Sequence, residues 1–155
     1  MSFSKAKEYL QKYNLQERIM EFETSSATVD MAAEAIGCTN GEIAKSLSFV
    51  VDEKPILVIV AGDKKIDNPK FKAEFHTKAK MLPFDDVERL IGHAVGGVCP
   101  FGINENVDIY LDVSLKKYDT VYPACGSSNS AVKLKLNELE QIIPYNKWVD
   151  VCKEL

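Results

Sequence analysis

The chain has 155 residues, of which 46% are hydrophobic, and its formal net charge is −4. This size suits one core, so we expect residues 1–155 to form a single domain. The acidic balance argues against broad electrostatic binding of nucleic acid, and no apolar run approaches the roughly 20 residues that cross a bilayer. The N-terminus lacks an apolar stretch of signal-peptide length, so we expect a cytoplasmic protein without a membrane partner.

The spacing of apolar residues, with glycine, proline and capping residues between them, predicts alternating helices and strands. Strands over 46–51 and 56–61 are joined by a hairpin connection over 52–55. The second of these strands is apolar on both faces, which places it in the middle of a sheet. The full expected order is a helix over 3–14, an edge strand over 19–23, a helix over 31–36, a helical turn at 39–42, the two hairpin strands, helices starting near 68 and 85, a strand over 107–113, a helical turn over 114–118, strands over 120–124 and 131–136, and a helix over 137–143.

Lys45 stands where the predicted helical turn passes into the first hairpin strand. Because strand side chains alternate, Lys45 shares a face with Leu47 and Phe49, while Ser46 and Ser48 point the other way. The Lys45 face should be buried, and a buried ammonium group needs a partner. We interpret Lys45 as a ligand for an anion or polar group arriving from outside, the alternative being a lysine that keeps only its tip in water at a strand end.

The four cysteines are widely spaced and form no C-x-x-C motif, which argues against a zinc site or a dithiol redox motif. They are expected to be free thiols in a reducing compartment, and we expect no metal and no cofactor. Six lysines and three acidic residues lie between residues 63 and 80. This segment either contacts phosphates or forms a solvated helix face.

Two loops rich in small residues follow the hairpin. Residues 96–102 read Gly-Gly-Val-Cys-Pro-Phe-Gly and residues 124–130 read Ala-Cys-Gly-Ser-Ser-Asn-Ser. Glycines in such loops let the backbone approach a ligand closely. With Lys45, their order resembles the YbaK/ProX family, the prolyl-tRNA-synthetase editing-domain-like proteins that hydrolyse wrongly charged aminoacyl-tRNA. The resemblance extends from about residue 25 to about residue 143.

The resemblance implies an α/β (α+β) fold, with a mixed, barrel-like β-sheet surrounded by helices. It implies a trans-editing hydrolase that deacylates mischarged aminoacyl-tRNA at its 3′ acceptor end, with an aminoacyl-tRNA synthetase as a further candidate partner. In this comparison Lys45 takes the place of the family's essential lysine and is the expected catalytic residue. Gly97, Pro100, Gly126 and Ser128 lie in the matching loops and are the expected substrate-binding residues. For Gly97, Pro100 and Gly126, an equal alternative to substrate contact is that they form tight turns that only shape the sheet ends.

Ester hydrolysis at such a site needs a positioned water, a grip on the adenosine end and stabilisation of the developing oxyanion, which glycine loops can provide through backbone N–H groups. We find no Ser-His-Asp arrangement, and His76 and His93 are expected at the surface or at helix ends. Some relatives have a histidine where this chain has residues 127–130. The water-positioning group therefore stays open, as do alanine, cysteine, serine and threonine esters as substrates.

Three other interpretations remain. A cysteine hydrolase would use Cys99 or Cys125, with His93 six residues from Cys99 in sequence. A binding module would hold a tRNA end, a nucleotide or a partner protein without turning it over. A purely structural Lys45 would predict that Lys45→Met stabilises the fold and leaves function unchanged. Trp148 is expected to pack on the core rather than to form an interface.

Overall fold

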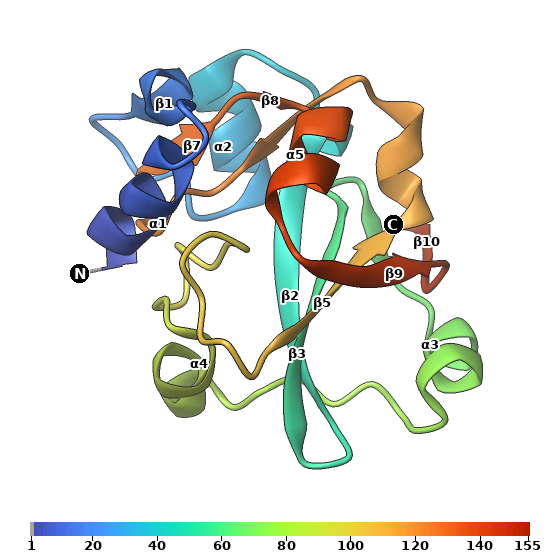
Figure 1. Cartoon of the computed structure of the whole chain (residues 1–155). Helices are drawn as coiled ribbons and strands as arrows, with labels where there is room; N and C mark the ends of the chain where they lie inside the picture. The colour runs from blue at the N-terminus through green and yellow to red at the C-terminus, as the bar shows by residue number, and fades with distance from the viewer. Residues whose placement is uncertain (1) are drawn as a thin grey trace.

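A computed structural model describes residues 2–155, which fold around a curled, six-stranded sheet with the strand order β8-β6-β2-β3-β5-β9 (Figure 1). Two further strand pairs, β1-β7 and β4-β10, extend it at the sides. The helices are α1 (Ser2–Gln11), α2 (Val29–Ile36), α3 (Asn68–Phe75), α4 (Phe84–Ile91) and α5 (Leu136–Ile142), with short 3-10 turns at Gln16–Arg18, Asn40–Glu42 and Val113–Lys117. The strands are β1 (Ile19–Glu21), β2 (Ile43–Val51), β3 (Lys54–Ala61), β4 (Lys64–Ile66), β5 (Asp108–Asp112), β6 (Thr120–Pro123), β7 (Ser130–Val132), β8 (Leu134–Lys135), β9 (Tyr145–Val149) and β10 (Cys152–Glu154).

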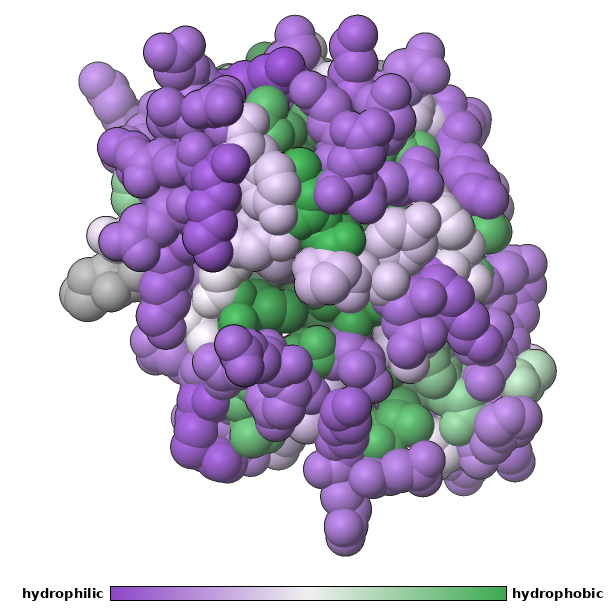
Figure 2. Space-filling view, in the orientation of Figure 1, coloured by the Kyte–Doolittle hydropathy of each residue, from purple (hydrophilic) through white to green (hydrophobic). Residues whose placement is uncertain are grey.

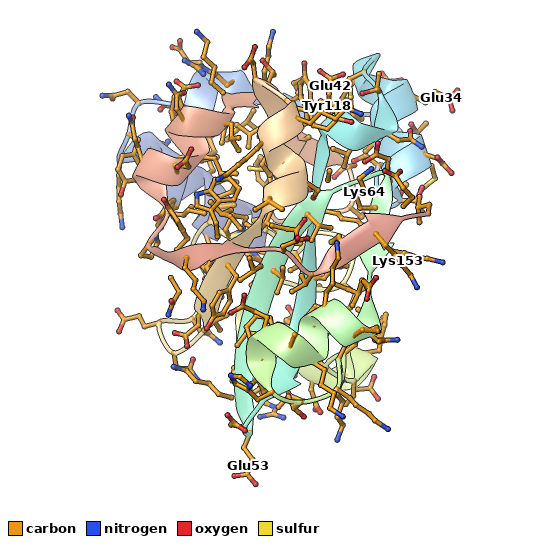
Figure 3. All side chains as sticks on the ribbon, turned by 90° about the vertical axis from the view of Figure 1, so that its right-hand side faces the viewer. Glu34, Glu42, Glu53, Lys64, Tyr118 and Lys153 are labelled. Carbon is orange, nitrogen blue, oxygen red and sulfur yellow. The ribbon has the colours of Figure 1, made fainter. Side chains whose placement is uncertain are left out.

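The predicted hairpin is the centre of this sheet. Strands β2 and β3 pair antiparallel from Ala44 to Val51 of β2, and β3 pairs on its other side with β5 in parallel. The hairpin turns at Asp52 and Glu53, which both have positive φ, the conformation of a two-residue hairpin loop whose twist matches that of the strands (Figure 3). From Pro55 to Ala61 every residue of β3 is buried. The central position expected for this apolar strand is therefore confirmed.

The two faces of the β2–β3 hairpin belong to different parts of the core. Phe49 of β2 packs with Val58 and Val60 of β3 and with Phe71 of α3. On the opposite face, Leu57 packs against α4, and the upper part of the sheet packs against a larger cluster that includes α1 and α5. Figure 1 shows α3 and α4 on opposite sides of the hairpin. Lys45 thus lies on the α3 face and Ser46 on the α4 face, as the strand alternation predicts.

The mixed α/β, barrel-like sheet with outer helices is confirmed, but several elements differ from the expected ones. Strand β2 begins at Ile43, and α1 ends at Gln11. Residues 131–136 do not form one strand: β7 pairs with β1, β8 pairs with β6, and α5 begins at Leu136. Leu136 N–H donates to the carbonyl oxygen of Asp119 at 2.8 Å, which fixes the chain as the helix starts. Apolar and polar residues do alternate over 131–136, but because the sheet curls, the first part of this segment pairs with β1 and the next part with β6.

Three short strands were not expected from the sequence. β9 pairs in parallel with β5, and β10 pairs antiparallel with β4. The β4–β10 pair carries charged residues, and Lys64 forms an ion pair with Glu154 at 2.6 Å; Lys64 and Lys153 lie on this side of the molecule in Figure 3. Such short strands have weak local signals, because their pairing is decided by partners far away in sequence rather than by local preference.

The surface is mainly hydrophilic on the face shown in Figure 2, where apolar residues gather toward the middle, between the polar margins. Within residues 2–155, none of the helices combines the length and the hydropathy that a membrane crossing requires.

Candidate active site

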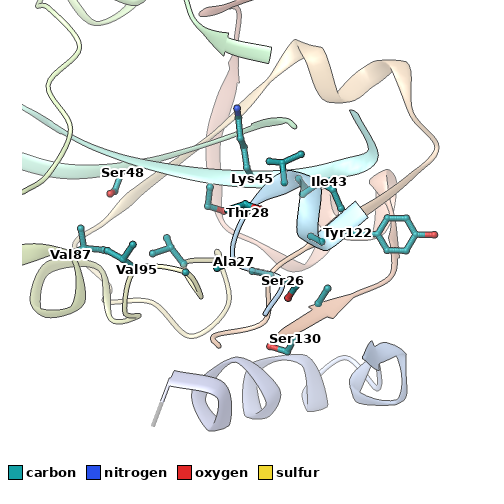
Figure 4. A pocket seen from close by; sticks show the side chains of 18 of the residues that line it. Ser26, Ala27, Thr28, Ile43, Lys45, Ser48, Val87, Val95, Tyr122 and Ser130 are labelled. Carbon is teal, nitrogen blue, oxygen red and sulfur yellow. The ribbon is translucent and has the colours of Figure 1, made fainter. Parts of the chain in front are cut away.

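A pocket of about 330 Å³ lies on the Ser46 side of β2. It is bordered by the segment that leads into α2, by α4, by the loop around residues 95–98, and by the chain from the end of β6 to β7 (Figure 4). Its walls are largely apolar, with Leu82, Val87, Val98 and Ala131 among them. This size and character are typical of a site for a small organic group.

The polar groups of the pocket are mostly hydroxyls, from Ser26, Thr28, Ser46, Ser48 and Ser130. Thr28 is already used as the cap of α2, since its Oγ1 accepts a hydrogen bond from the N–H of the third helical residue at 3.2 Å. Ser130 shares a hydrogen bond with the neighbouring serine hydroxyl at residue 127. The Ser46 Oγ is buried and has no hydrogen-bond partner within residues 2–155. Buried polar atoms are rarely left unpaired, so this one marks an unusual position.

Lys45 is the one charged residue in the pocket lining of the described chain. Its side chain points away from Ser48, Val87 and Val95 (Figure 4), and its Nζ donates a hydrogen bond to the Lys64 carbonyl oxygen at 2.5 Å. Burial lowers the pKa of Lys45, and the nearby Cys152 and Asp63 oppose that shift. The lysine therefore stands at the edge of the pocket, with its ammonium group on the far face of the sheet.

Gly97 and Gly126 lie directly against each other. The Gly126 N–H donates to the Gly97 carbonyl oxygen at 3.1 Å, and a Cβ on Gly97 would come within 2.5 Å of the Gly126 carbonyl carbon. Gly126 also has a φ of +84°, which favours glycine. Neither glycine is in the pocket lining, whereas Gly96 is. The two loops thus meet backbone to backbone behind the pocket wall.

Ser128 and Pro100 are placed differently from each other. The Ser128 carbonyl oxygen accepts a hydrogen bond from the Ser26 N–H at 2.7 Å, which ties the second loop to the segment before α2, and the Ser128 side chain is exposed. Pro100 is buried and outside the pocket lining. The structure therefore brings Gly97, Gly126 and Ser128 together beside the pocket lining at Gly96, while Pro100 does not line the pocket and the Lys45 ammonium group lies on the other face of the sheet.

The cysteines of the loops are poor candidates for a nucleophile. Cys99 and Cys125 are fully buried and do not line the pocket. Burial raises the pKa of the Cys99 thiol far above its usual range and that of Cys125 to about 12. His93 follows the end of α4, as expected for a helix-end residue, but it is buried, with Nε2 at 2.6 Å from the Phe101 carbonyl oxygen. Burial lowers the pKa of His93.

Sequence reasoning missed most of the pocket wall. Met81 and Phe84 are exposed apolar residues at its rim, with 58% and 74% of their surface accessible, and Val87 lines it from α4. A signal for the other wall was present in the alternation of β2, because Ser46 and Ser48 are small hydroxyl residues on the face opposite Lys45. Within residues 2–155, no group of three or more histidine, cysteine or acidic side chains comes together as metal ligands would.

Comparison with known proteins connects this pocket to a protein family. The family described as the aminoacyl-tRNA editing domain matches residues 23–142. The chain is 48% identical to YwhH of Bacillus subtilis (strain 168), a protein of uncharacterised function, over 99% of both chains. It is 27% identical to EbsC of Enterococcus faecalis (strain ATCC 700802 / V583), a proposed Cys-tRNA(Pro)/Cys-tRNA(Cys) deacylase, over 69% of this chain and 66% of EbsC.

The fold leads to the same family. A crystal structure described as that of a proposed trans-editing enzyme for prolyl tRNA synthetase superposes with a TM-score of 0.87 at 27% identity, over 98% of this chain and 97% of the other. The match covers the strands and loops that form the pocket, and the family match covers most of the chain. The resemblance noted in the sequence is therefore confirmed, and the chain belongs to the aminoacyl-tRNA editing domain family.

Proposed function

We propose that the pocket beside β2 binds the 3′ aminoacyl end of a mischarged tRNA, and that residues 1–155 act in trans as one editing domain. Membership of the editing family makes the chain an aminoacyl-tRNA deacylase, a hydrolase of the ester between an amino acid and tRNA. The observation that carries the finer proposal is the contrast within the pocket: apolar walls and hydroxyls inside, and a single lysine at the edge. Such a site suits a small amino acid inside and phosphates outside.

Lys45 is the proposed catalytic residue. In the free protein its ammonium group has one neutral carbonyl acceptor, that of Lys64. A phosphate or ribose oxygen of the tRNA end offers a stronger, charge-assisted hydrogen bond, and the four-carbon stem of lysine lets the group turn toward it. Lys45 then supplies positive charge beside the ester. No carboxylate or histidine of residues 2–155 lines the pocket, so positioning and electrostatic stabilisation carry the reaction in this proposal.

The proposed substrate-binding residues divide into two roles. Gly97, Pro100 and Gly126 shape the loops, since the N–H groups of both glycines already donate to backbone carbonyls. Ser128 is exposed at the same end of the pocket, where its hydroxyl contacts the terminal nucleotide. Prolyl-tRNA synthetase is the proposed synthetase partner, because the structural relative is described as a trans-editing enzyme for it. The proposed location is the cytoplasm, where charged tRNA is used.

The test is release of free amino acid from tRNAs charged with alanine, cysteine, serine, threonine and proline. We expect turnover of one or a few mischarged species, and a kcat/KM about 10- to 100-fold lower in Lys45→Ala, as loss of a hydrogen bond to a charged group predicts. The matched control is Lys65→Ala, which changes an exposed lysine of β4 without an ion pair in the described residues. Tight binding of charged tRNA without release of any amino acid would instead identify a non-catalytic binding module.

A further inference from the structure

The outer edge of β2, the edge away from β3, has two partners with a gap between them. Its first residues, Ile43 and Ala44, pair with β6. Further along, Ser48 accepts a hydrogen bond from the Leu82 N–H at 3.2 Å, and Val50 donates to the Lys80 carbonyl oxygen at 2.9 Å. Among residues 2–155, no strand or bridge partner faces residues 45–47 on this edge.

Ser46 is the residue whose main chain faces this gap. In an antiparallel strand the N–H and C=O of one residue point to the same edge, and neighbouring residues point to opposite edges. Since Ser48 and Val50 bond outward, Ser46 presents both of its main-chain groups outward too, while those of Lys45 and Leu47 face β3. The gap opens into the pocket, because Ala124 on one side of the gap and Met81 on the other side both line the pocket.

We propose that the aminoacyl group of the substrate fills this gap as a strand of one residue. The α-ammonium group donates a hydrogen bond to the Ser46 carbonyl oxygen, and the Ser46 N–H donates to the carbonyl oxygen of the ester. This inference rests on the proposed function and assigns the recognition of the amino acid's main-chain groups to Ser46.

The chemistry of the two partners matches. An α-amino ester carries a donor and an acceptor on either side of one carbon, as a strand residue does, so it can pair with one residue of an open edge. The gap exposes the paired groups of one residue, which is too short for a docking peptide strand. A backbone N–H aimed at the ester carbonyl also stabilises the oxyanion that forms there.

The reaction follows from this placement. Water adds to the carbonyl carbon, and the electron pair of the C=O bond moves to the oxygen that faces the Ser46 N–H. The carbonyl then re-forms as the bond to the ribose oxygen breaks, and that oxygen takes up a proton from the added water. The free amino acid and the tRNA with its restored hydroxyl leave.

In this proposal the two faces of β2 contact different parts of the substrate. Beside the gap, the Ser46 face is hollow and lined by Leu82, Val87 and Val98, so the substrate's side chain enters there. The other face holds the Lys45 ammonium group, near Asp63 and the Lys64 carbonyl. The amino acid is recognised on one side of the strand, and the charged tRNA end is met on the other.

The free protein provides a first test by amide hydrogen exchange. The Ser46 N–H lacks a partner on the edge, so we expect it to exchange at least about tenfold faster than the Val50 N–H, which lies on the same edge of the same strand and is hydrogen-bonded. Equal protection of the two amides would show that the edge is closed at Ser46 and would overturn the inference.

The second test adds 3′-deoxy-3′-(L-alanylamino)adenosine, a non-hydrolysable analogue, to the ¹⁵N-labelled protein. We expect the Ser46 amide proton to shift downfield and become protected from exchange. The analogue with lactate in place of alanine, which has a hydroxyl for the ammonium group, should bind about tenfold more weakly. The inference fails, with the proposed function intact, if amides of Val98 and Ala131 respond, esters are hydrolysed, and Ser46 stays unchanged. If no pocket amide responds and no ester is hydrolysed, both fail.

Discussion

The side chains of β2 point alternately to the two faces of the sheet, and this alternation separates the polar groups of the site. Lys45 and Ser46 are neighbours in sequence, yet their side chains lie on opposite faces of the sheet. That Lys45 lies on the face opposite Ser46 could be predicted from the sequence, because alternation is a local property of an extended chain. The direction taken by its ammonium group could not, because its acceptor, the Lys64 carbonyl, is set by the path of the chain after β3.

The buried cysteines give a prediction at the same scale. Cys99→Ala and Cys125→Ala should each keep kcat within about threefold of the native value, because a thiol whose pKa is raised by burial supplies little thiolate. The measurement is amino acid release from the best substrate, with circular dichroism to show that each variant is folded. Complete loss of turnover in a folded variant would restore the cysteine hydrolase interpretation.

The two loops act as one element, because they touch through glycine backbones. Gly97→Ala places a Cβ against the Gly126 carbonyl carbon, and repacking of that kind typically costs about 1–3 kcal/mol. We expect a lower free energy of unfolding and a lower kcat/KM, since the shifted loop includes Gly96, which lines the pocket. Urea unfolding and deacylation assays on the same preparation would measure both.

The matched control for this prediction is Gly37→Ala. Gly37 ends α2 with a φ of +85°, and a Cβ there meets no atom within 4 Å. This variant should lose stability through backbone strain alone, by about 1 kcal/mol, and keep its kcat. Equal loss of activity in the two variants would show that the effect of Gly97→Ala is global destabilisation rather than a change of the loops.

For the whole molecule, His93 should make stability depend on pH. Its pKa is lowered from the ordinary value of 6.5, mainly by burial, while the Phe101 carbonyl opposes the shift. As pH falls through 6.5, the unfolded chain binds a proton that the folded chain does not, so the free energy of unfolding decreases until the folded pKa is reached. Urea unfolding between pH 7.5 and 5 should show this loss, and His93→Gln should reduce it.

His76 provides the control. It ends α3 with a φ of +63° and is exposed, and asparagine tolerates that conformation, so His76→Asn should leave the pH dependence of unfolding unchanged. If His93→Gln retains the full native pH dependence, another group is responsible for it.

The surroundings of the lysine-rich segment, residues 63–80, also depend on the fold of the whole molecule. Residues 63–80 include β4 and α3, which cover the Lys45 face of the sheet. Lys64 and Lys70 are ion-paired with Glu154 and Asp150 near the C-terminus, at 2.6 and 3.1 Å. The C-terminal segment thus neutralises part of the local excess of lysines over acidic residues in this segment. Trp148, on β9, is partly buried against the core, as expected.

The sequence by itself determined the features that depend on neighbours along the chain. These are the β2–β3 hairpin, the alternation of side chains along β2 and the order of motifs that identified the family. The tertiary structure alone decided the pairing of β4 with β10 and of β5 with β9, the split of residues 131–136, and the gap at Ser46. These depend on contacts between segments far apart in sequence, whose pairing is selected by packing of the whole core rather than by local preference.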